Sequence, residues 1–546
     1  MKKSFLRSTA LALLVLLSQA SAFSQENNIE KPQDGFARLG NEYPDALVPM
    51  TTLERKLFAD VTGLLTRAQN RKPGTPGYLP NVSGASLWSV KDYKKGDILV
   101  NLDRSLIGES WGAEIEEFLD PLRYAVEDVA GKRVKKVGSV MFIFNGKDPA
   151  AYDPAVPQPS PLKQDAPSDA PTPLAATGPV VVSAGHGLYY HYGFKDWRAQ
   201  RNPSNGLIED YMTPLLATPL RNFLTNRSRV TSYLVRQSTV STEIHEPSGQ
   251  RWWRVAARYY LQKILPDNKE IWHSLPNATY ALREYDEDIR SRPLYANHLG
   301  ATTLLSIHTN ANDNAALSGT RVYYNNALAT ATSNQKLAAS LSCYMRELIT
   351  AVDKYKTFKV GSPVVANDKG EIRLAKMPAA IVEVAFHTNA GDAAALKDSA
   401  FRLAAMKGVE KGLRLYNQNQ PCKPFAITSI PSATGPHNMP FPVTVNYAGF
   451  PQFVVKAEVE IVSCPAGWDC HGGTITYSKQ TPTPLKFDWT CTTSDPSQTV
   501  TTGIQTTLID VDGVKTKTVP SSVICTPGAA TAPTANGPNS SSISLQ

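Results

Sequence analysis

Between residues 179 and 418 the chain alternates short apolar runs with amphipathic segments. The runs rich in Val, Ile and Leu predict buried strands, and apolar residues spaced three and four positions apart predict helices. Strands are expected at 179–183, 230–235, 303–308, 320–324 and 380–386, and helices at 208–226, 336–352 and 401–416. This alternation predicts an α/β fold in which a central, largely parallel or mixed sheet is flanked by helices.

The residues on either side follow different patterns. Upstream, helical segments and apolar runs predict a small α+β domain, with helices at 53–67 and 113–129 and strands at 97–103 and 139–144. Downstream of Pro424, apolar and charged residues alternate from Val455 to Ile461, and Asp512-Gly513 separates two β-forming runs. Alternation of this kind buries one face of a strand, and Asp-Gly favours a hairpin, so this part is expected to be an all-β sandwich.

The beginning of the chain has the pattern of a secretory signal peptide. Basic residues precede an apolar run from Ala10 to Leu17, and Ala20-Ser21-Ala22 has the small-x-small pattern of a cleavage site. The protein is therefore expected to be secreted, to the periplasm or the extracellular medium, without a membrane span. Of the formal charge of +8, three positive charges belong to this leader, which leaves +5. That mild excess suits an anionic cell wall and is too small to predict a nucleic-acid partner.

Composition divides the chain further. Residues 149–178 are rich in proline and cannot build a core, which predicts a linker. The expected order is a signal peptide at 1–22, a flexible lead at 23–50, the small α+β domain at 51–147, the linker at 148–178, the α/β domain at 179–420, the disulfide-braced sandwich at 421–526 and a disordered tail at 527–546.

The six cysteines favour disulfide bonds. An even number in an exported chain is typical of disulfide pairing rather than of metal binding. Five of the six follow residue 420, so the bridges are expected mainly in the C-terminal domain: Cys422, Cys464, Cys470, Cys491 and Cys525. Cys343 lies in a helical pattern and could instead be an ordinary buried thiol.

Four polar residues stand out against the apolar runs of the α/β domain. His186 follows a strand within Gly-His-Gly, and His308 ends another strand. Glu383 interrupts the apolar run 380–386, where a carboxylate is costly without a charged partner. The fourth, Glu209, begins a helix. Taken singly, the histidines could be hydrogen-bonded turn or core residues, and Glu209 could simply favour a helix N-terminus.

Together these residues could form a hydrolytic zinc site. Two imidazoles and one carboxylate are a common catalytic zinc set that leaves a position open for water. The metal makes that water acidic, and a second carboxylate can then take up the proton and return it to the leaving amine. Glycine at positions 185 and 187 would let the backbone approach closely.

The segments resemble those of the zinc-dependent N-acetylmuramoyl-L-alanine amidases, a family of cell-wall hydrolases that separate bacterial daughter cells. The resemblance covers about 179–418 and includes Gly185-His186-Gly187, Glu209, Val235-Arg236, Arg292 with Ala296-Asn297, Ser306–Asn310, and Val382–Phe386 with Asn389. Three departures are Ser183-Ala184 before Gly-His, Asp210 beside Glu209, and His387 where a non-ligating residue is usual.

The resemblance implies a function and a set of site residues. It assigns zinc to His186, Glu209 and His308, and the general acid–base to Glu383. It implies substrate contacts from Arg292, Asn310 and Asn389. The implied reaction is hydrolysis of the amide between N-acetylmuramic acid and L-alanine in peptidoglycan, and a regulatory protein partner is a further expectation.

Two alternatives remain open at this point. The zinc site could serve a peptidoglycan peptidase, which product analysis would distinguish from an amidase. The fold could also be a non-catalytic wall-binding scaffold, which the complete set of four residues argues against. The insertion from about Gln237 to Asp286, with an expected helix at 251–260, could cover or extend the groove or could simply pack on the domain.

Overall fold

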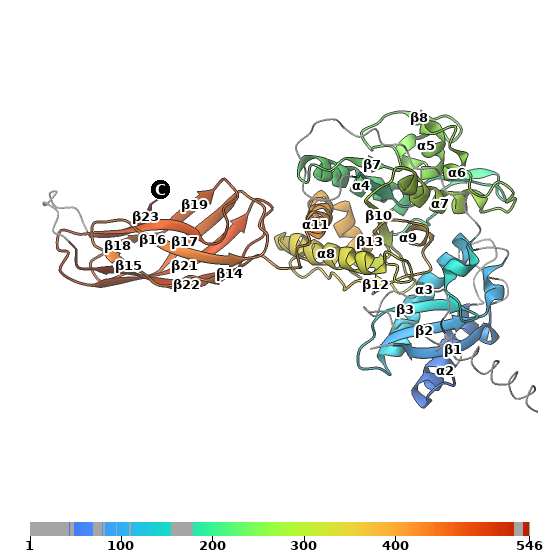
Figure 1. The fold of residues 1–546 in the computed structure, drawn as a ribbon, viewed down its shortest axis with the longest axis horizontal. Coiled ribbons are helices and arrows are strands. Elements are labelled where there is room, and N and C mark those ends of the chain that lie inside the picture. Colours follow the sequence, from blue (N-terminus) through green and yellow to red (C-terminus); the bar gives the residue numbers. More distant parts are fainter. Residues whose placement is uncertain are drawn as a thin grey trace, which may run out of the picture.

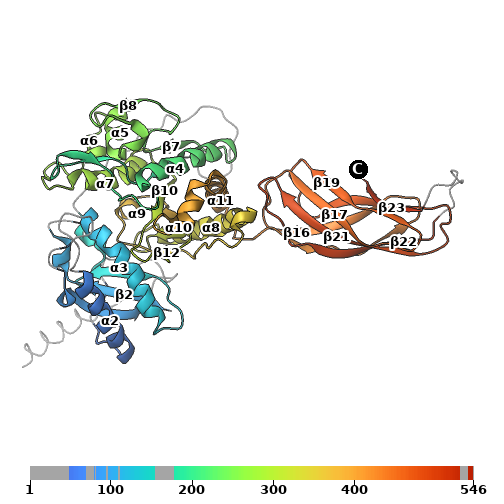
Figure 2. The same ribbon diagram turned by 180° about the vertical axis from the view of Figure 1, so that it is seen from behind.

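The 546-residue chain is described by a computed structural model. The structure describes residues 43, 48–68, 79, 82–93, 96–108, 111–153, 178–528 and 539–544. An N-terminal part lies beside a central part, and an elongated C-terminal part projects away from both (Figures 1 and 2). The predicted signal peptide, almost all of the predicted lead and residues 154–177 of the predicted linker lie outside the described residues.

The central part is built on a six-stranded sheet with the order β12-β11-β13-β10-β4-β7. All neighbouring strands are parallel except β11 and β13, so the sheet is mixed, as the sequence predicts. The strands are β4 (Val180–Ala184), β7 (Ser232–Leu234), β10 (Thr303–Asn310), β11 (Arg321–Tyr324), β12 (Val364–Val365) and β13 (Ala379–Phe386).

Helices cover both faces of this sheet (Figure 1). One apolar core is formed with α4 (Glu209–Asn226), α8 (Ala331–Thr350), α10 (Ala390–Lys397) and α11 (Ser399–Asn417). A second core, on the other face, is formed with α5 (Ala257–Ile264), α6 (Lys269–Trp272), α7 (Arg283–His298) and α9 (Gly370–Arg373). Burial of both faces explains why β13 is almost continuously apolar and why every residue of β10 is buried.

Two short hairpins complete the central part: β5 (Tyr189–His191) with β6 (Asp196–Arg198), and β8 (Ile244–His245) with β9 (Gln250–Arg251). None of the helices among the described residues has the length and apolar composition needed to span a bilayer.

The N-terminal part is the expected small α+β unit. Its sheet has the order β1-β2-β3, and its strands and helices are β1 (Leu87–Tyr93), β2 (Asp97–Leu102), β3 (Val140–Phe144), α2 (Thr52–Ala68) and α3 (Ala113–Gly131). The parallel pair β2–β3 requires a crossover connection, which α3 supplies. The unit has an apolar core of its own, and β3 also lies beside β12 of the central part.

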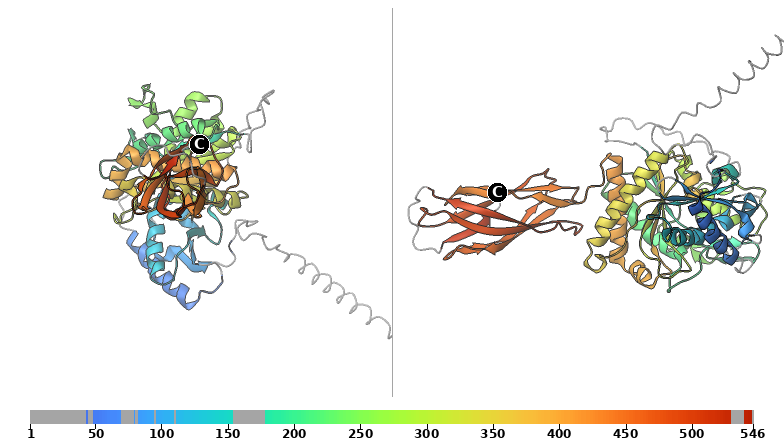
Figure 3. Two further views of the ribbon diagram at one scale, coloured as in Figure 1. Left: turned by 90° about the vertical axis from the view of Figure 1, so that its left-hand side faces the viewer. Right: turned by 90° about the horizontal axis from the view of Figure 1, so that it is seen from below.

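The C-terminal part consists of two five-stranded sheets, β14-β16-β20-β23-β18 and β15-β22-β21-β17-β19, which enclose one core (Figure 3). Its alternating sequence has the predicted effect: in β17, Val455, Ala457 and Val459 are buried and the residues between them are exposed. The strands are β14 (Ala426–Ser429), β15 (Ala433–Pro436), β16 (Phe441–Ala448), β17 (Val455–Ser463), β18 (Asp469–His471), β19 (Gly473–Tyr477), β20 (Leu485–Thr492), β21 (Val500–Asp510), β22 (Val519–Thr526) and β23 (Ser540–Ser544).

Strand β23 corrects the expectation of a disordered tail. Its backbone pairs with β18 and β20, and the Trp489 indole donates a hydrogen bond of 2.8 Å to the Ser541 hydroxyl. The polar composition of this segment had suggested disorder, but a strand needs only one apolar face, and Ile543 packs against the core.

The predicted linker and lead are likewise partly ordered against the central part. Asp148 is buried and accepts a hydrogen bond of 2.9 Å from Asn367, while Asp153 forms an ion pair with Arg373. Tyr43, in the predicted lead, is also buried. These contacts join residues more than two hundred positions apart, and local composition cannot reveal them.

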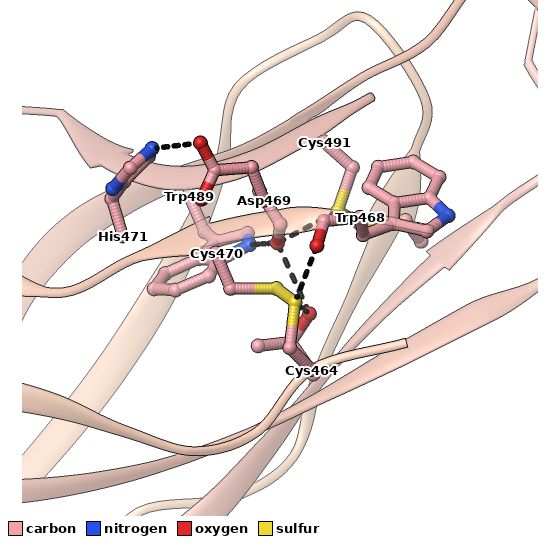
Figure 4. Close-up of a disulfide and its surroundings, with 10 residues drawn as sticks. Cys464, Trp468, Asp469, Cys470, His471, Trp489 and Cys491 are labelled. Carbon is pink, nitrogen blue, oxygen red and sulfur yellow. Dashed lines mark hydrogen bonds and ion pairs between the residues drawn. A yellow bond between two sulfur atoms is a disulfide. The ribbon is translucent and has the colours of Figure 1, made fainter. Parts of the chain in front are cut away.

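All six cysteines are paired: Cys343–Cys422, Cys464–Cys470 and Cys491–Cys525. Cys343 is therefore not an ordinary thiol, because α8 lies beside the segment that leads into the C-terminal part. The bridge between Cys464 and Cys470 closes the loop that carries Trp468 and Asp469 (Figure 4).

Peptide mapping without reduction should recover these three linked pairs. We expect this result because each cysteine lies next to one partner and disulfide bonds persist in an exported chain. Free thiols at Cys343 and Cys422, detected by alkylation of the folded protein, would contradict the pairing between the central and C-terminal parts.

Candidate metal centre

Neighbouring strands bring the candidate residues together at one edge of the central sheet. His186 follows β4, His308 lies in β10 and Glu383 lies in β13. These three strands are adjacent and parallel, and His308 is directly opposite Glu383 in the register of β10 and β13. Glu209 is the first residue of α4. The parallel arrangement thus places residues that are far apart in the sequence at the same edge.

The turn that carries His186 has a tightly constrained backbone. His186 itself has a φ of 59°, and the Arg236 guanidinium donates to the carbonyl oxygens of Gly185 and His186 at 3.0 and 2.9 Å. A Cβ atom on Gly185 would lie 2.2 Å from Cε1 of His308, and one on Gly187 would lie 2.6 Å from Cα of Ala256. The two glycines are therefore required by the His308 imidazole and by the neighbouring backbone.

The donor atoms of His186, Glu209 and His308 form a compact group. Nδ1 of His308 lies 3.1 Å from Nε2 of His186 and 3.3 Å from Oε1 of Glu209, and Nε2 of His186 lies 3.5 Å from the same oxygen. Two ligands that are each ~2.1 Å from a tetrahedral zinc ion lie roughly 3.4 Å apart. The three atoms therefore fit the spacing of ligands around one such ion.

The outer nitrogen of each imidazole meets a buried acceptor. Nδ1 of His186 lies 2.9 Å from Oε1 of Gln200, and Nε2 of His308 lies 3.0 Å from Oε1 of Glu371. Gln200 donates to Asp288 at 2.9 Å, and Arg292 forms ion pairs with both Asp288 and Glu371. We call these residues the outer network: Gln200, Asp288, Arg292 and Glu371. It fixes both imidazoles with their inner nitrogens free to bind a metal.

Electrostatics favour a cation at this position. Burial alone would raise the pKa of Glu371, but Arg292 and His308 hold that pKa far below its usual range, so the carboxylate is charged. Burial lowers the pKa of His186 well below its usual value, which keeps this imidazole neutral, the form that binds metals. Glu209 and Glu371, both carboxylates, flank His308. Arg292 pairs with Glu371, and Arg201 pairs with the outer oxygen of Glu209. The inner oxygen of Glu209 and the neutral imidazole of His186 can therefore offer lone pairs to a cation.

Asp210 has a structural role distinct from that of Glu209. It accepts hydrogen bonds from the backbone N–H groups of Gly187, Gln200 and Arg201, at 2.9, 2.7 and 3.1 Å. Its carboxylate thus ties together the two loops beside the centre. Glu209 instead points at the histidines and also accepts a bond of 2.8 Å from the N–H of Thr309.

Glu383 lies beside the three-residue group in a cavity of about 450 Å³. One of its carboxylate oxygens has no hydrogen-bond partner among the described residues. Burial, reinforced by the neighbouring Glu209 and opposed by His308, raises the pKa of Glu383 to about 8. A carboxyl group with a pKa near neutrality can both take up and release a proton.

The other candidates occupy different positions. Asn310 and His387 line the cavity. Asn389 instead caps α10 by accepting hydrogen bonds from backbone N–H groups, and it is not among the described residues that line the cavity. Arg292, expected to contact substrate, is fully buried within the outer network and does not reach the cavity.

The insertion expected at 237–286 does not cover this cavity. No described residue of that range lines it. The expected single helix at 251–260 is a 3₁₀ turn at Trp252–Arg254 followed by the start of α5. Trp253 is buried and its carbonyl accepts a bond of 2.7 Å from Arg236, so this segment braces the His186 turn from behind.

Residues 180–414 match the family model of the N-acetylmuramoyl-L-alanine amidases. A stretch of 123 residues is 34% identical to N-acetylmuramoyl-L-alanine amidase LytC of Bacillus subtilis (strain 168). Residues 180–414 belong to the N-acetylmuramoyl-L-alanine amidase family. The LytC match covers 21% of this chain and 22% of that protein, so the chain spans about a fifth of this relative's length. Below, the range 180–414 is called the amidase domain.

Solved structures of amidases are also similar. The catalytic domain of CwlV, an N-acetylmuramoyl-L-alanine amidase from Bacillus (Paenibacillus) polymyxa var. colistinus, is 18% identical, with 44% of this chain and 97% of that chain covered and a TM-score of 0.28. The CwlD amidase from Clostridioides difficile, in complex with the GerS lipoprotein, is 17% identical, with 44% and 100% covered and a TM-score of 0.31.

Sequence reasoning missed the outer network of the amidase domain apart from Arg292. One signal was present in α7, where the run Arg283–Arg292 is dense in charge although it lies between apolar segments. Such a run usually indicates a solvated helix, but almost all of α7 is buried. Gln200 and Glu371 lie in segments without a recognisable motif.

We expect zinc binding to depend on the inner and outer residues to different degrees. His186→Ala and His308→Ala each remove a donor atom and should abolish stoichiometric zinc binding. Glu371→Gln keeps the donors but weakens the orientation of His308, and should reduce zinc affinity by about 10- to 100-fold. Elemental analysis and competition with a chelator measure both effects.

The matched control is His437→Ala, because His437 is a buried histidine in the C-terminal part. That variant should keep full zinc. If His186→Ala or His308→Ala also retained full zinc, the proposed ligand set would be refuted.

Proposed function

We propose that the protein hydrolyses the amide bond between N-acetylmuramic acid and L-alanine in bacterial peptidoglycan. The observation that carries this proposal is the compact group of His186, Glu209 and His308 beside a cavity that Glu383 also lines, within a domain of the amidase family. Zinc dependence is typical of this family. The donor set of two imidazoles and one carboxylate supports zinc as the resident ion.

In this proposal His186, Glu209 and His308 hold the ion. A bound zinc ion would supply Lewis acidity, polarising the substrate carbonyl and lowering the pKa of a water molecule. Hydrogen bonds from Nδ1–H of His186 to Gln200 and from Nε2–H of His308 to Glu371 select the tautomers whose inner nitrogens carry lone pairs. The outer network thus supports metal binding without touching the substrate.

Glu383 is proposed to move the proton. Glu383 lines the cavity, and one of its carboxylate oxygens is buried without a hydrogen-bond partner among the described residues, which supports its accepting a proton from the attacking water. The leaving amine of L-alanine must gain a proton when the C–N bond breaks, and the same carboxyl group can return it. His387 and Asn310 line the cavity, which supports a role for both in contacting the substrate around this bond.

The proposed setting is outside the cytoplasm. Three disulfide bonds in a chain with no described free cysteine favour an oxidising compartment, and peptidoglycan lies in the same location. This placement agrees with the signal peptide expected from the sequence.

Mass spectrometry of digested peptidoglycan tests the proposal. The zinc-loaded protein should release intact stem peptides that begin with L-alanine and leave glycan strands with free lactyl groups, and a chelator should stop the release. Shortened or divided stem peptides would instead indicate a peptidase, and no release at all would indicate a scaffold.

Replacing Glu383 should separate metal binding from catalysis. Glu383→Gln preserves size but cannot accept the proton, so kcat should fall by about 10²- to 10⁴-fold while zinc content stays stoichiometric. Stopped assays of stem-peptide release, paired with elemental analysis, measure the two properties. A wild-type rate for this variant would make Glu383 a structural residue.

A further inference from the structure

Helix α3 of the N-terminal part forms one side of the cavity that contains the metal centre. Glu117, Asp120 and Pro121 of α3 line the cavity together with His186 and Glu209. In Figures 1 and 2, α3 lies on the side of the N-terminal part that faces the amidase domain. The metal centre is thus enclosed by two separate parts of the chain.

Two carboxylates of α3 pair with two cations of the amidase domain. Glu117 forms an ion pair with Arg201 and also accepts a hydrogen bond of 2.9 Å from the Tyr285 hydroxyl. Asp120 forms an ion pair with Lys369. Glu117 and Asp120 are three positions apart, so they lie on the same face of the helix.

Both cations lie next to the proposed catalytic residues. Nε of Arg201 is 3.4 Å from Oε2 of Glu209. Lys369 lines a small recess under α3 together with His308 and Glu383. The amidase domain therefore presents two positive charges immediately around the position where the scissile amide would bind.

These cations need anionic partners. The side chains of Arg201 and Lys369 are only 16% and 11% exposed, and a buried charge without a partner is strongly unfavourable. In the described structure Asp120 of α3 pairs with Lys369, and Arg201 pairs with Glu117 of α3 as well as with Glu209. The stem peptide of peptidoglycan carries carboxylates close to the L-alanine amide, so the substrate can also supply anionic partners for Arg201 and Lys369.

The size of the cavity argues that α3 and the substrate compete. About 450 Å³ lies in the lower part of the range that holds one drug-sized molecule. A peptidoglycan substrate extends from the scissile bond as a glycan on one side and a peptide on the other. With α3 in place, Glu117, Asp120 and Pro121 occupy one side of the space into which such a substrate would extend.

We propose that Arg201 and Lys369 bind carboxylate groups of the stem peptide, and that Glu117 and Asp120 occupy these two cations until substrate replaces them. The proposal rests on the peptidoglycan amidase function proposed above. It assigns substrate specificity to two residues of the amidase domain and an inhibitory role to one helix of the N-terminal part.

The remaining contacts of the N-terminal part would keep it attached when these ion pairs break. Leu99, Met141 and Ile143 belong to the main apolar core of the amidase domain, and β3 lies beside β12. Within α3, Arg123 also keeps its buried ion pair with Asp368. Neutralising Glu117 and Asp120 should therefore free Arg201 and Lys369 without releasing α3 or the N-terminal part.

The first experiment uses the zinc-loaded full chain and purified peptidoglycan. The double variant Glu117→Gln with Asp120→Asn should raise kcat/KM by about tenfold, because a competing contact is removed. The control is Glu127→Gln, which removes another α3 carboxylate paired with an amidase-domain arginine, Arg321, at 2.8 Å. Glu127 does not line the metal cavity, so this variant should stay within about twofold of wild type.

The second experiment tests carboxylate recognition with two soluble probes, N-acetylmuramoyl-L-alanyl-D-glutamic acid and its diamide. Wild type and the Glu117→Gln, Asp120→Asn variant should prefer the acid. Arg201→Gln and Lys369→Gln should raise KM for the acid by about tenfold and leave the diamide unchanged, with zinc content checked because Arg201 contacts Glu209.

Several outcomes overturn the proposal. Unchanged or lower activity of the double variant on peptidoglycan would make α3 a permanent part of the substrate site. If wild type cleaved the acid and the diamide with equal kcat/KM, Arg201 and Lys369 would not be binding substrate carboxylates. If the double variant does not fold, as judged by thermal melting, Glu117→Gln and Asp120→Asn are tested singly, and each should give part of the increase.

Failure of the proposed function gives a different result. In that case neither wild type nor any variant would cleave either probe. Calorimetric binding of the acid and the diamide to the full chain would still show whether Arg201 and Lys369 recognise carboxylates.

Discussion

The arrangement of this molecule depends on the compensation of buried charge at one edge of the central sheet. Three carboxylates and two imidazoles are enclosed there within a few ångströms, and a buried ion is strongly unfavourable unless it is paired or bound to a metal. Arg292 accounts for part of the balance by pairing with both Asp288 and Glu371. The inner nitrogens of the two histidines and the Glu209 carboxylate then face one point, where they can bind a cation. The carboxylates farther from this point are already paired with arginine.

The same constraint explains α7, whose sequence is highly charged although the helix is buried. Asp288 and Arg292 are one turn apart, so they pair with each other and meet Gln200 and Glu371 from the neighbouring segments. A helix with a solvated polar face would look identical in the sequence. What distinguishes α7 is that its polar partners lie on other segments, and only the folded chain brings those segments together.

The extent to which sequence predicted the site follows from where each residue lies. His186, His308 and Glu383 interrupt or end apolar strands, so a polar residue in a hydrophobic run identified them, and parallel strands explain their convergence. Glu209 was distinguishable from Asp210 only by family resemblance, because adjacent residues at a helix start have the same local pattern. Their roles as ligands and acid–base remain predictions.

Non-local pairing explains what the sequence did not predict. Strand β23 and the ordered residues around Asp148 are polar segments whose partners are tens or hundreds of positions away. Arg292 was singled out by its family resemblance, but a motif does not say whether an arginine faces substrate or a buried carboxylate. The fold class of the central and C-terminal parts was predictable because periodicity depends only on which faces are buried.

Helix α3 illustrates the limit of periodicity most clearly. Phe118, Leu119 and Leu122 pack into the core of the N-terminal part, as an amphipathic pattern predicts. The pattern does not say what the polar face of the helix contacts, and in most amphipathic helices this face contacts water. Here that face is buried against the amidase domain: Arg123 pairs with Asp368, and Tyr124 contacts Asn310 beside the metal centre. One ordinary amphipathic helix therefore serves two interfaces, an apolar one that folds its own domain and a polar one that borders the proposed chemistry of its neighbour.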